Sequence, residues 1–157
     1  MEKDHICKVY VDWTEKKKGI VRFDEERKGE VAFSVPPEFM GHHHIVTPED
    51  LFLSSVLTCL ASYFFNMASR SRLKFVSFRS CAKSKLLEMG PDYIFSDIEI
   101  DVNIRVRDRK EEHKARRAME VAERGCYVAN SITSKVIVKK IIEIVEENKE
   151  KEKINPS

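Results

Sequence analysis

The sequence predicts an α+β fold in which a long central helix and a later helix pack on antiparallel sheets. Two apolar periods carry this prediction. A period of two, typical of strands, recurs in short segments on both sides of a long apolar stretch at 47–70, and a helical period returns at 109–124. The strands fall into two groups, each followed by a helix, which gives the order β-β-β-α-β-β-α-β.

The first group of strands lies before residue 36. In residues 6–13, ICKVYVDW, alternate positions place Cys7, Val9, Val11 and Trp13 on one face, which predicts a half-buried strand with Cys7 in the core. TEKKKG reads as a turn. The segments GIVRFDEE and GEVAFSV then predict two further short strands, so the three strands form an antiparallel meander.

The long helix is predicted to begin at TPED and to run to about residue 70. Thr47 can accept hydrogen bonds from free N–H groups, Pro48 suits the first helical position, and Asp50 stands where a capping-box acid belongs. Residues 51–67 are apolar nearly all round the helix. This pattern predicts a central helix rather than a peripheral one.

The second group begins near residue 75, where the period returns to two. Residues 97–107, DIEIDVNIRVR, alternate cleanly, and the two strands are joined around Gly90 and Pro91. An apolar stripe over 109–124 predicts a helix that Gly125 ends. A last strand is expected from Val136, followed by a charged tail that is helical or frayed.

Length and charge limit the classes of function. The 157 residues fit one domain, residues 1–157, with a core at about 6–145 and a charged tail at 146–157. With 28 basic and 26 acidic residues the net charge is +2, which argues against nucleic acid and anionic membranes as partners. No run of 18 apolar residues and no apolar signal region occur, so we expect a cytoplasmic protein without a membrane span.

Three residues are candidates for chemistry, each with an ordinary structural alternative. Cys59 is either a small core residue or, because its helical face is half polar, part of a pocket wall. Cys126 follows a helix-ending glycine, where a thiol is either packed as a cap or exposed enough to react. Glu49 at a helix start is explained by capping and the helix dipole alone.

Other residues suggest neither a metal nor a cofactor. The four cysteines form no CxxC pair, which argues against structural zinc. His42, His43 and His44 are consecutive and point in different directions, so a polar loop is expected rather than a metal site. Cys81 shares the face of Arg79 and Lys83 and is expected to face solvent; neither it nor Cys7 is assigned a role. GxGxxG, P-loop, HExxH and GxSxG motifs are all missing.

Taken together, PPEF, TPEDLFLSSVLTC and AERGCYVANSI resemble the OsmC/Ohr family of organic hydroperoxide reductases. The resemblance covers roughly residues 6–145. It rests on a Pro-Glu pair that opens a long helix (Pro48 and Glu49), Cys59 ten residues after that glutamate, and Cys126 after a late helix. The family fold implies an interlocked homodimer with two active sites at the interface.

The resemblance also implies a reaction. Cys59 would attack an organic hydroperoxide as a thiolate and become a sulfenic acid, and Cys126 would condense with it to a disulfide. A dithiol, in this family typically a dihydrolipoyl group, would restore both thiols. Glu49 would orient a cation that stabilises the thiolate.

Two departures from the family pattern keep other functions open. The family arginine in the turn after the first strand is absent; Lys17 or a neighbour, or Arg22 on the next strand, could serve as the cation, but lysine lacks the bidentate fork. Tyr127 stands where proline commonly follows the second cysteine. These departures motivate an alternative, a relative that binds small molecules or senses redox state. A thioesterase-like α+β dimer is a third possibility, although it leaves the cysteines unexplained.

Overall fold

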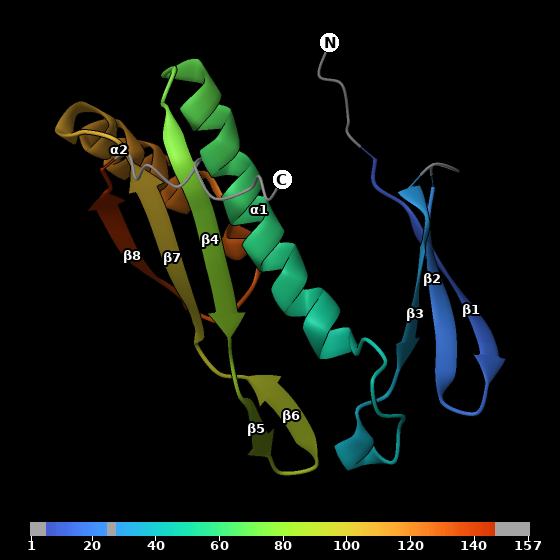
Figure 1. The fold of residues 1–157 in the computed structure, drawn as a ribbon. Helices are drawn as coiled ribbons and strands as arrows, with labels where there is room; N and C mark the ends of the chain where they lie inside the picture. Colours follow the sequence, from blue (N-terminus) through green and yellow to red (C-terminus); the bar gives the residue numbers. More distant parts are fainter. Residues whose placement is uncertain (1–5, 25–27, 147–157) are drawn as a thin grey trace, which may run out of the picture. The chain divides into compact units, whose positions relative to one another are not determined.

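The computed structural model describes residues 6–24 and 28–146 of the chain (Figure 1). The chain divides into two compact units, Met1–Phe52 and Leu53–Ser157. The prediction of a single domain over 1–157 stays a prediction. The described elements are β1 (Val9–Glu15), β2 (Lys18–Phe23), β3 (Glu30–Ser34), η2 (Pro37–Phe39), α1 (Pro48–Arg70), β4 (Phe75–Lys83), β5 (Leu86–Met89), β6 (Asp92–Phe95), β7 (Ile98–Val106), α2 (Arg109–Gly125), η3 (Ala129–Ser131) and β8 (Val136–Ile144).

The first unit contains the predicted meander, an antiparallel sheet in the order β1-β2-β3. Val21 in the central strand β2 pairs with Val11 of β1 on one side and with Val31 of β3 on the other. The segment after β3 is tied back to the sheet by the buried Ser34. Its hydroxyl accepts a hydrogen bond from the backbone N–H of His42 at 3.2 Å, and its own N–H donates to the carbonyl of Val46 at 2.9 Å.

The strand β1 differs from its prediction in burial. Its alternating pattern was expected to give a half-buried strand, yet Val9, Val11 and Trp13 are 63%, 62% and 73% exposed. Cys7, which was predicted to lie in the core, is also exposed. Alternation identifies an apolar face, but it does not provide the surface that covers that face.

The second unit is built on the sheet β4-β7-β8 (Figure 1). The α+β class and the predicted element order are confirmed, with one addition: the connection around Gly90 and Pro91 forms a hairpin of its own, β5–β6. One pairing differs from the predicted antiparallel arrangement, because β8 runs parallel to β7. The helix α2 lies between them in sequence and returns the chain to the same end of the sheet, as a crossover connection does.

The core of the second unit lies between this sheet and the two helices. Strand β7 buries every second side chain, and both helices contribute small and apolar residues to the same layer. Phe64 of α1 stacks on Phe78 of β4 with 4.9 Å between ring centroids. The fully or nearly fully buried members are Val56, Leu60, Phe64, Ala68, Ile98, Ile100, Val102, Ile104, Val106, Ala115, Ala118, Met119 and Ala122.

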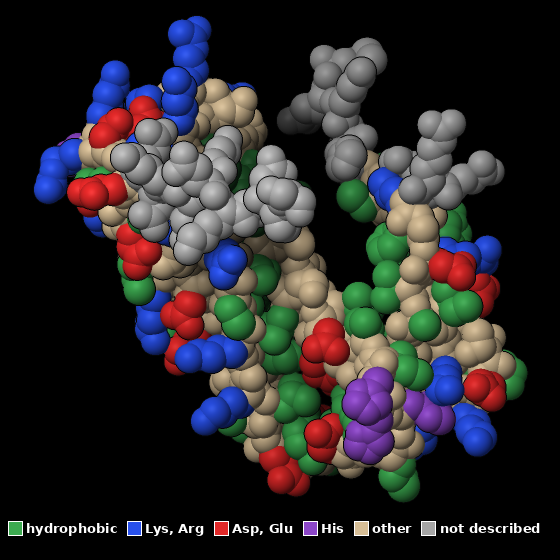
Figure 2. All heavy atoms as spheres, viewed as in Figure 1, with side chains coloured by type: hydrophobic (Ala, Val, Ile, Leu, Met, Phe, Trp, Pro, Cys, Tyr) green, Lys and Arg blue, Asp and Glu red, His purple; other side chains and the backbone are tan. Residues whose placement is uncertain are grey.

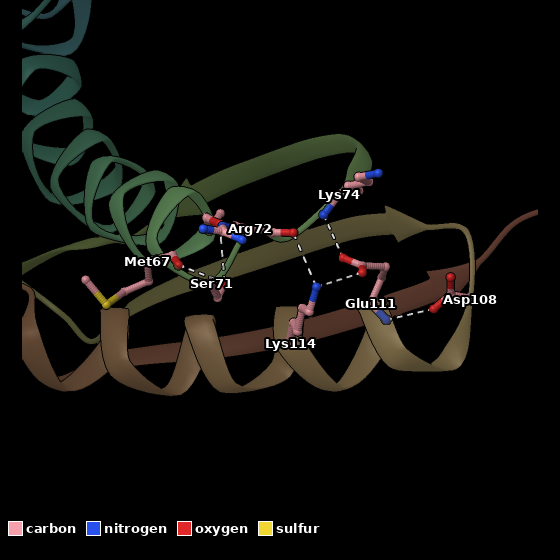
Figure 3. Close-up of polar contacts among 8 residues, drawn as sticks. Met67, Ser71, Arg72, Lys74, Asp108, Glu111 and Lys114 are labelled. Atoms are coloured by element: carbon pink, nitrogen blue, oxygen red, sulfur yellow. Dashed lines mark hydrogen bonds and ion pairs between the residues drawn. The ribbon is translucent and has the colours of Figure 1, made fainter.

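A buried carboxylate fixes the start of α2 beside the loop that follows α1 (Figure 3). Asp108 caps α2 by accepting the N–H of Glu111 at 2.9 Å. The Glu111 carboxylate accepts the backbone N–H of Lys74 at 2.6 Å and the ammonium of Lys114 at 2.8 Å. Lys114 also donates to the carbonyl of Arg72 at 3.3 Å, so the α1–β4 loop and α2 are joined by one polar cluster.

The distribution of surface charge and the apolar character of α1 are relevant to binding of nucleic acids and membranes. On the face shown in Figure 2, basic and acidic side chains are interspersed and form no large patch of one sign. Within the described residues, α1 is long and apolar enough to span a membrane by length and composition alone, a test that the core helix of a soluble protein also passes. The predicted helical or frayed tail from residue 147 onward lies outside the described residues.

Candidate active site

The start of α1 matches the predicted capping box. The carboxylate of Asp50 accepts the N–H of Thr47 at 2.9 Å, and the Thr47 hydroxyl accepts the N–H of Asp50 at 3.3 Å. Glu49 therefore is not needed for capping. Its Oε2 atom is buried and has no hydrogen-bond partner among the described residues. A buried carboxylate oxygen without a donor is costly, so this position calls for a cationic or N–H partner.

Cys59 lies further along the same helix, ten residues after Glu49. At 1.5 Å of rise per residue, the two backbone positions are about 15 Å apart along the helix axis. The Cys59 side chain is only 8% exposed, and its neighbours Val56 and Leu60 belong to the core. Of the two interpretations of Cys59, the structure shows a buried residue that does not line the cavity described below, and its role in the chemistry stays a prediction.

Cys126 is placed beside Cys59 by the end of α2. The helix ends at Gly125, and Cys126 turns away with extended backbone angles before the short helix η3. The Cys126 side chain is 1% exposed, and both thiols are free rather than joined in a disulfide. The two side chains lie close enough to interact. The structure thus brings together the two cysteines that lie 67 residues apart in the sequence.

The environment of Cys126 raises the pKa of its thiol. Burial is the largest cause, and the hydrogen bond with Cys59 and the charge that Cys59 carries when ionised act in the same direction. The backbone N–H groups of Ala129 and Val128 donate to the sulfur and oppose the rise. Cys126 is therefore held in its protonated form more firmly than an ordinary cysteine, while two N–H groups remain directed at it.

A close contact between α1 and α2 sets this arrangement. A Cβ atom at Gly125 would lie 2.4 Å from Cζ of Tyr63, so only glycine lets the ring pack against the backbone here. Tyr63 follows Cys59 by one helical turn, and Gly125 immediately precedes Cys126. The contact therefore sits directly beside the thiol pair. Gly125 was predicted as a helix terminator; its contact with Tyr63 gave no signal in the sequence.

The loop after Cys126 is held by its own hydrogen bonds. The N–H of Asn130 donates to the carbonyl of Cys126 at 3.0 Å, and the Asn130 side chain donates to the carbonyl of Arg124 at 3.1 Å. The Ser131 hydroxyl donates to the carbonyl of Tyr127 at 2.7 Å. These bonds form without a proline after Cys126, so the loop is ordered around Tyr127.

A cavity of about 330 Å³ lies within the second unit beside Cys126. Its apolar wall comes from α1 and from β7 and β8, and includes Val56, Leu60 and Ile100. Its polar side is formed largely by the segment between η3 and β8, where Thr133, Ser134 and Lys135 lie. Cys126 is one of the lining residues. The sequence suggested a pocket wall at Cys59, but Cys59 does not line this cavity, whose position depends on how three elements pack.

The two cations suggested by the sequence have other partners in the first unit. The ammonium of Lys17 donates to the carbonyl of Phe39 at 2.8 Å, and Arg22 forms an ion pair with Asp12. The role of either side chain beside Glu49 stays a prediction. Cys81 is exposed, as expected. Among residues 6–24 and 28–146, no three His, Cys, Asp or Glu side chains are grouped so that they could hold a metal ion.

A model of the OsmC-like protein family matches residues 41–140 of the sequence. This chain belongs to the OsmC family. The matched region contains Glu49, Cys59 and Cys126, so the resemblance carried by TPEDLFLSSVLTC and AERGCYVANSI is confirmed at the level of the family. A search among curated proteins found no match.

Solved structures show the OsmC fold directly. An OsmC-like protein of unknown function from Vibrio cholerae superposes with a TM-score of 0.74 at 17% identity, covering 87% of this chain and 99% of that one. An organic hydroperoxide resistance protein from Elizabethkingia anophelis gives 0.69 at 18% identity, covering 92% and 100%. An OsmC-like protein from Mycoplasma pneumoniae gives 0.73 at 12% identity, covering 89% and 99%.

Proposed function

We propose that this OsmC-family chain is a thiol-dependent peroxidase that reduces organic hydroperoxides to alcohols. The observation that carries the proposal is the proximity of the thiols of Cys59 and Cys126, both buried in the second unit. Membership of the OsmC family supports a hydroperoxide-related redox function. Structural neighbours from Elizabethkingia anophelis and Legionella pneumophila that are named organic hydroperoxide resistance proteins support it as well.

The proposed reaction uses the two thiols in sequence. The Cys59 thiolate attacks the distal oxygen of ROOH, the O–O bond breaks, and the alkoxide takes a proton to leave as alcohol. The resulting sulfenic acid at Cys59 is attacked by the sulfur of Cys126, which loses its proton as water departs and a disulfide forms. A dithiol, for which a dihydrolipoyl group is the expected form, reduces the disulfide and becomes oxidised itself.

The raised pKa of Cys126 suits this order of events. Burial and the neighbouring Cys59 side chain raise the pKa of Cys126, so this thiol is held in its protonated form and acts second, as the group that attacks the sulfenic acid.

A cation is still needed beside Glu49. The Oε2 atom of Glu49, which has no partner in residues 6–24 and 28–146, is the place where such a group would bind, and Lys17 and Arg22 remain the candidates. Each would have to leave its present partner, Phe39 or Asp12. The proposed assembly is a homodimer, as the family fold implies, in a cytoplasmic protein. The exposed apolar face of β1 supports an interface of this kind.

The test is turnover of cumene hydroperoxide by the reduced protein with dihydrolipoamide as dithiol. Cys59→Ser should abolish peroxide loss, and Cys126→Ser should stop the cycle at the sulfenic acid, which a sulfenic-acid probe would detect. Cys81→Ser, which alters an exposed thiol outside the pair, is the matched control and should keep full turnover. Turnover that survives Cys59→Ser would disprove the proposal.

A second function, small-molecule binding or redox sensing without efficient turnover, is favoured by the present partners of the two cations. With Lys17 on the Phe39 carbonyl and Arg22 on Asp12, neither ammonium nor guanidinium is engaged with Glu49. Stopped-flow alkylation of Cys59 across pH 5–10 decides between the two functions, because a peroxidatic thiolate stays reactive at low pH and an ordinary thiol does not.

A further inference from the structure

The cavity beside Cys126 suggests how the oxidised pair of cysteines is reduced. It has a volume of about 330 Å³, which is at the lower end of the range for small-molecule sites. Of the two paired thiols, Cys126 lines the cavity and Cys59 does not. A small molecule that enters here therefore meets the sulfur of Cys126 first.

The lining matches a small thiol on a short carbon chain. Val56 and Leu60 of α1 give an apolar wall, while Thr133, Ser134 and Lys135 give a polar side. Glu123, which also lines the cavity, is neutralised by an ion pair with Lys140. Lys135 forms no ion pair with an acidic side chain in the described part of the chain, so the field in the cavity favours an anion such as an attacking thiolate.

Building on the proposed peroxidase function, we propose that a dithiol reductant enters through this cavity and attacks the sulfur of Cys126, so that Cys59 is the leaving group. In the first step a reductant thiolate bonds to Cys126 Sγ, the Cys59–Cys126 bond breaks, and Cys59 leaves as a thiolate. In the second step the other thiol of the reductant loses its proton. It then attacks the reductant sulfur that is bonded to Cys126 in the mixed disulfide. Cys126 is released and takes a proton, and the dithiol ends as a cyclic disulfide.

The direction of attack agrees with the chemistry of the two sulfurs. In thiol–disulfide exchange a thiol with a raised pKa is a poor leaving group. Burial raises the pKa of Cys126, so an attack that expels Cys126 is disfavoured. Attack on Cys126 also releases Cys59 as a thiolate, which is the form that attacks the next hydroperoxide.

The test maps which sulfur a monothiol attacks. The full-length protein is oxidised with diamide, so that the disulfide forms without any hydroperoxide, and is then exposed briefly to 2-mercaptoethanol. After acid quenching, the freed thiol is alkylated and both peptides are identified by mass spectrometry. We expect the mercaptoethanol adduct on Cys126 and the alkyl group on Cys59, in at least about tenfold excess over the reverse pattern, which corresponds to 1.4 kcal/mol.

The outcomes separate this inference from the proposed function. An adduct mainly on Cys59, or no disulfide after diamide, overturns the inference. A disulfide that forms with diamide and opens at Cys126, but does not form with cumene hydroperoxide, supports the inference and contradicts the peroxidase.

Lys135 provides an independent test of the entry route. The rate of disulfide opening is compared for anionic 2-mercaptoethanesulfonate and neutral 2-mercaptoethanol. In Lys135→Glu the ratio of the anionic to the neutral rate should fall by roughly threefold to tenfold, because the local charge is reversed. Lys110→Glu, at the exposed start of α2, makes the same charge change away from the cavity and should leave the ratio unchanged. An unchanged ratio in Lys135→Glu, or an equal fall in Lys110→Glu, overturns entry through the cavity.

Discussion

Strands β1 and β7 follow the same sequence pattern but end in opposite environments. Both alternate apolar and polar residues, and both were predicted to bury one face. In β7 the apolar face is covered by the chain's own helices, and Ile98, Ile100 and Ile104 are fully buried. In β1 the corresponding side chains, Val9, Val11 and Trp13, are more than half exposed.

The difference shows that an alternating pattern specifies a face to be covered without specifying what covers it. For β7 the cover is encoded nearby, in the apolar stripes of α1 and α2. For β1 the chain offers three exposed apolar side chains on one face, a feature that marks interaction surfaces. Substitutions on the two strands should therefore have different consequences.

The largest contrast is expected between Ile104→Ala and Val11→Ala. Ile104 is fully buried, so its truncation should lower the free energy of unfolding by about 2–5 kcal/mol through lost burial and a cavity. Val11→Ala should cost under about 0.5 kcal/mol within the isolated chain, because that side chain is exposed. Urea unfolding at low protein concentration measures both. Equal losses would show that β1 is buried by its own chain.

The second contrast concerns association. If a second copy covers the β1 face, Val11→Glu should weaken the homodimer by about 2–3 kcal/mol, or roughly 30–150-fold in dissociation constant, because a charge would be buried there. Sedimentation equilibrium measures this constant. Thr14→Glu, exposed on the same strand but outside the Val9–Val11–Trp13 face, should change it little. A monomeric wild-type protein at all concentrations would remove the homodimer from the proposal.

The third prediction examines the contact that places the two cysteines. Gly125→Ala should displace Tyr63 and cost about 1–3 kcal/mol, since the added methyl group would lie 2.4 Å from the ring. Disulfide formation with diamide should slow as well, because Cys126 moves with the backbone. Gly125→Ala combined with Tyr63→Ala relieves the clash and should recover the rate of disulfide formation. If Gly125→Ala alone forms the disulfide at the wild-type rate, the contact does not position Cys126.

The fourth prediction concerns the polar cluster that holds α2 over the β7 face. Hydrogen bonds from Lys114 and from the Lys74 N–H lower the pKa of Glu111. The cluster therefore stabilises the fold fully above the unfolded pKa of ~4.3 and loses this contribution as pH falls through the lower folded value. Glu111→Gln should cost about 1–2 kcal/mol at pH 7, and the difference from wild type should shrink between pH 5 and 3. Thermal unfolding across that range measures it; a difference that grows toward low pH would contradict the assigned sign.

Local signals predicted much of this molecule. The capping box at Thr47 and Asp50, the two helices and most strands follow from residues close together in the sequence. The parallel pairing of β8 does not, because strand direction depends on the route of the connection and not on side-chain period. The β5–β6 hairpin is too short for periodicity to distinguish it from a loop.

The candidate site divides in the same way. Family resemblance pointed to Glu49, Cys59 and Cys126, and the structure places the two cysteines close together. The ring of Tyr63 against Gly125 and the cavity beside Cys126 depend on packing between distant elements. No sequence period carries such information, so these features could be found only in three dimensions.

The two donors that face the sulfur of Cys126 come from the main chain, at Val128 and Ala129. A substitution at either position leaves both donors in place unless it introduces proline, which lacks an N–H. Evolution can then vary the chemistry of the loop surface while the sulfur keeps the same two neighbours. The surroundings of the Cys126 thiol therefore depend on the backbone conformation of this turn and not on the side chains within it.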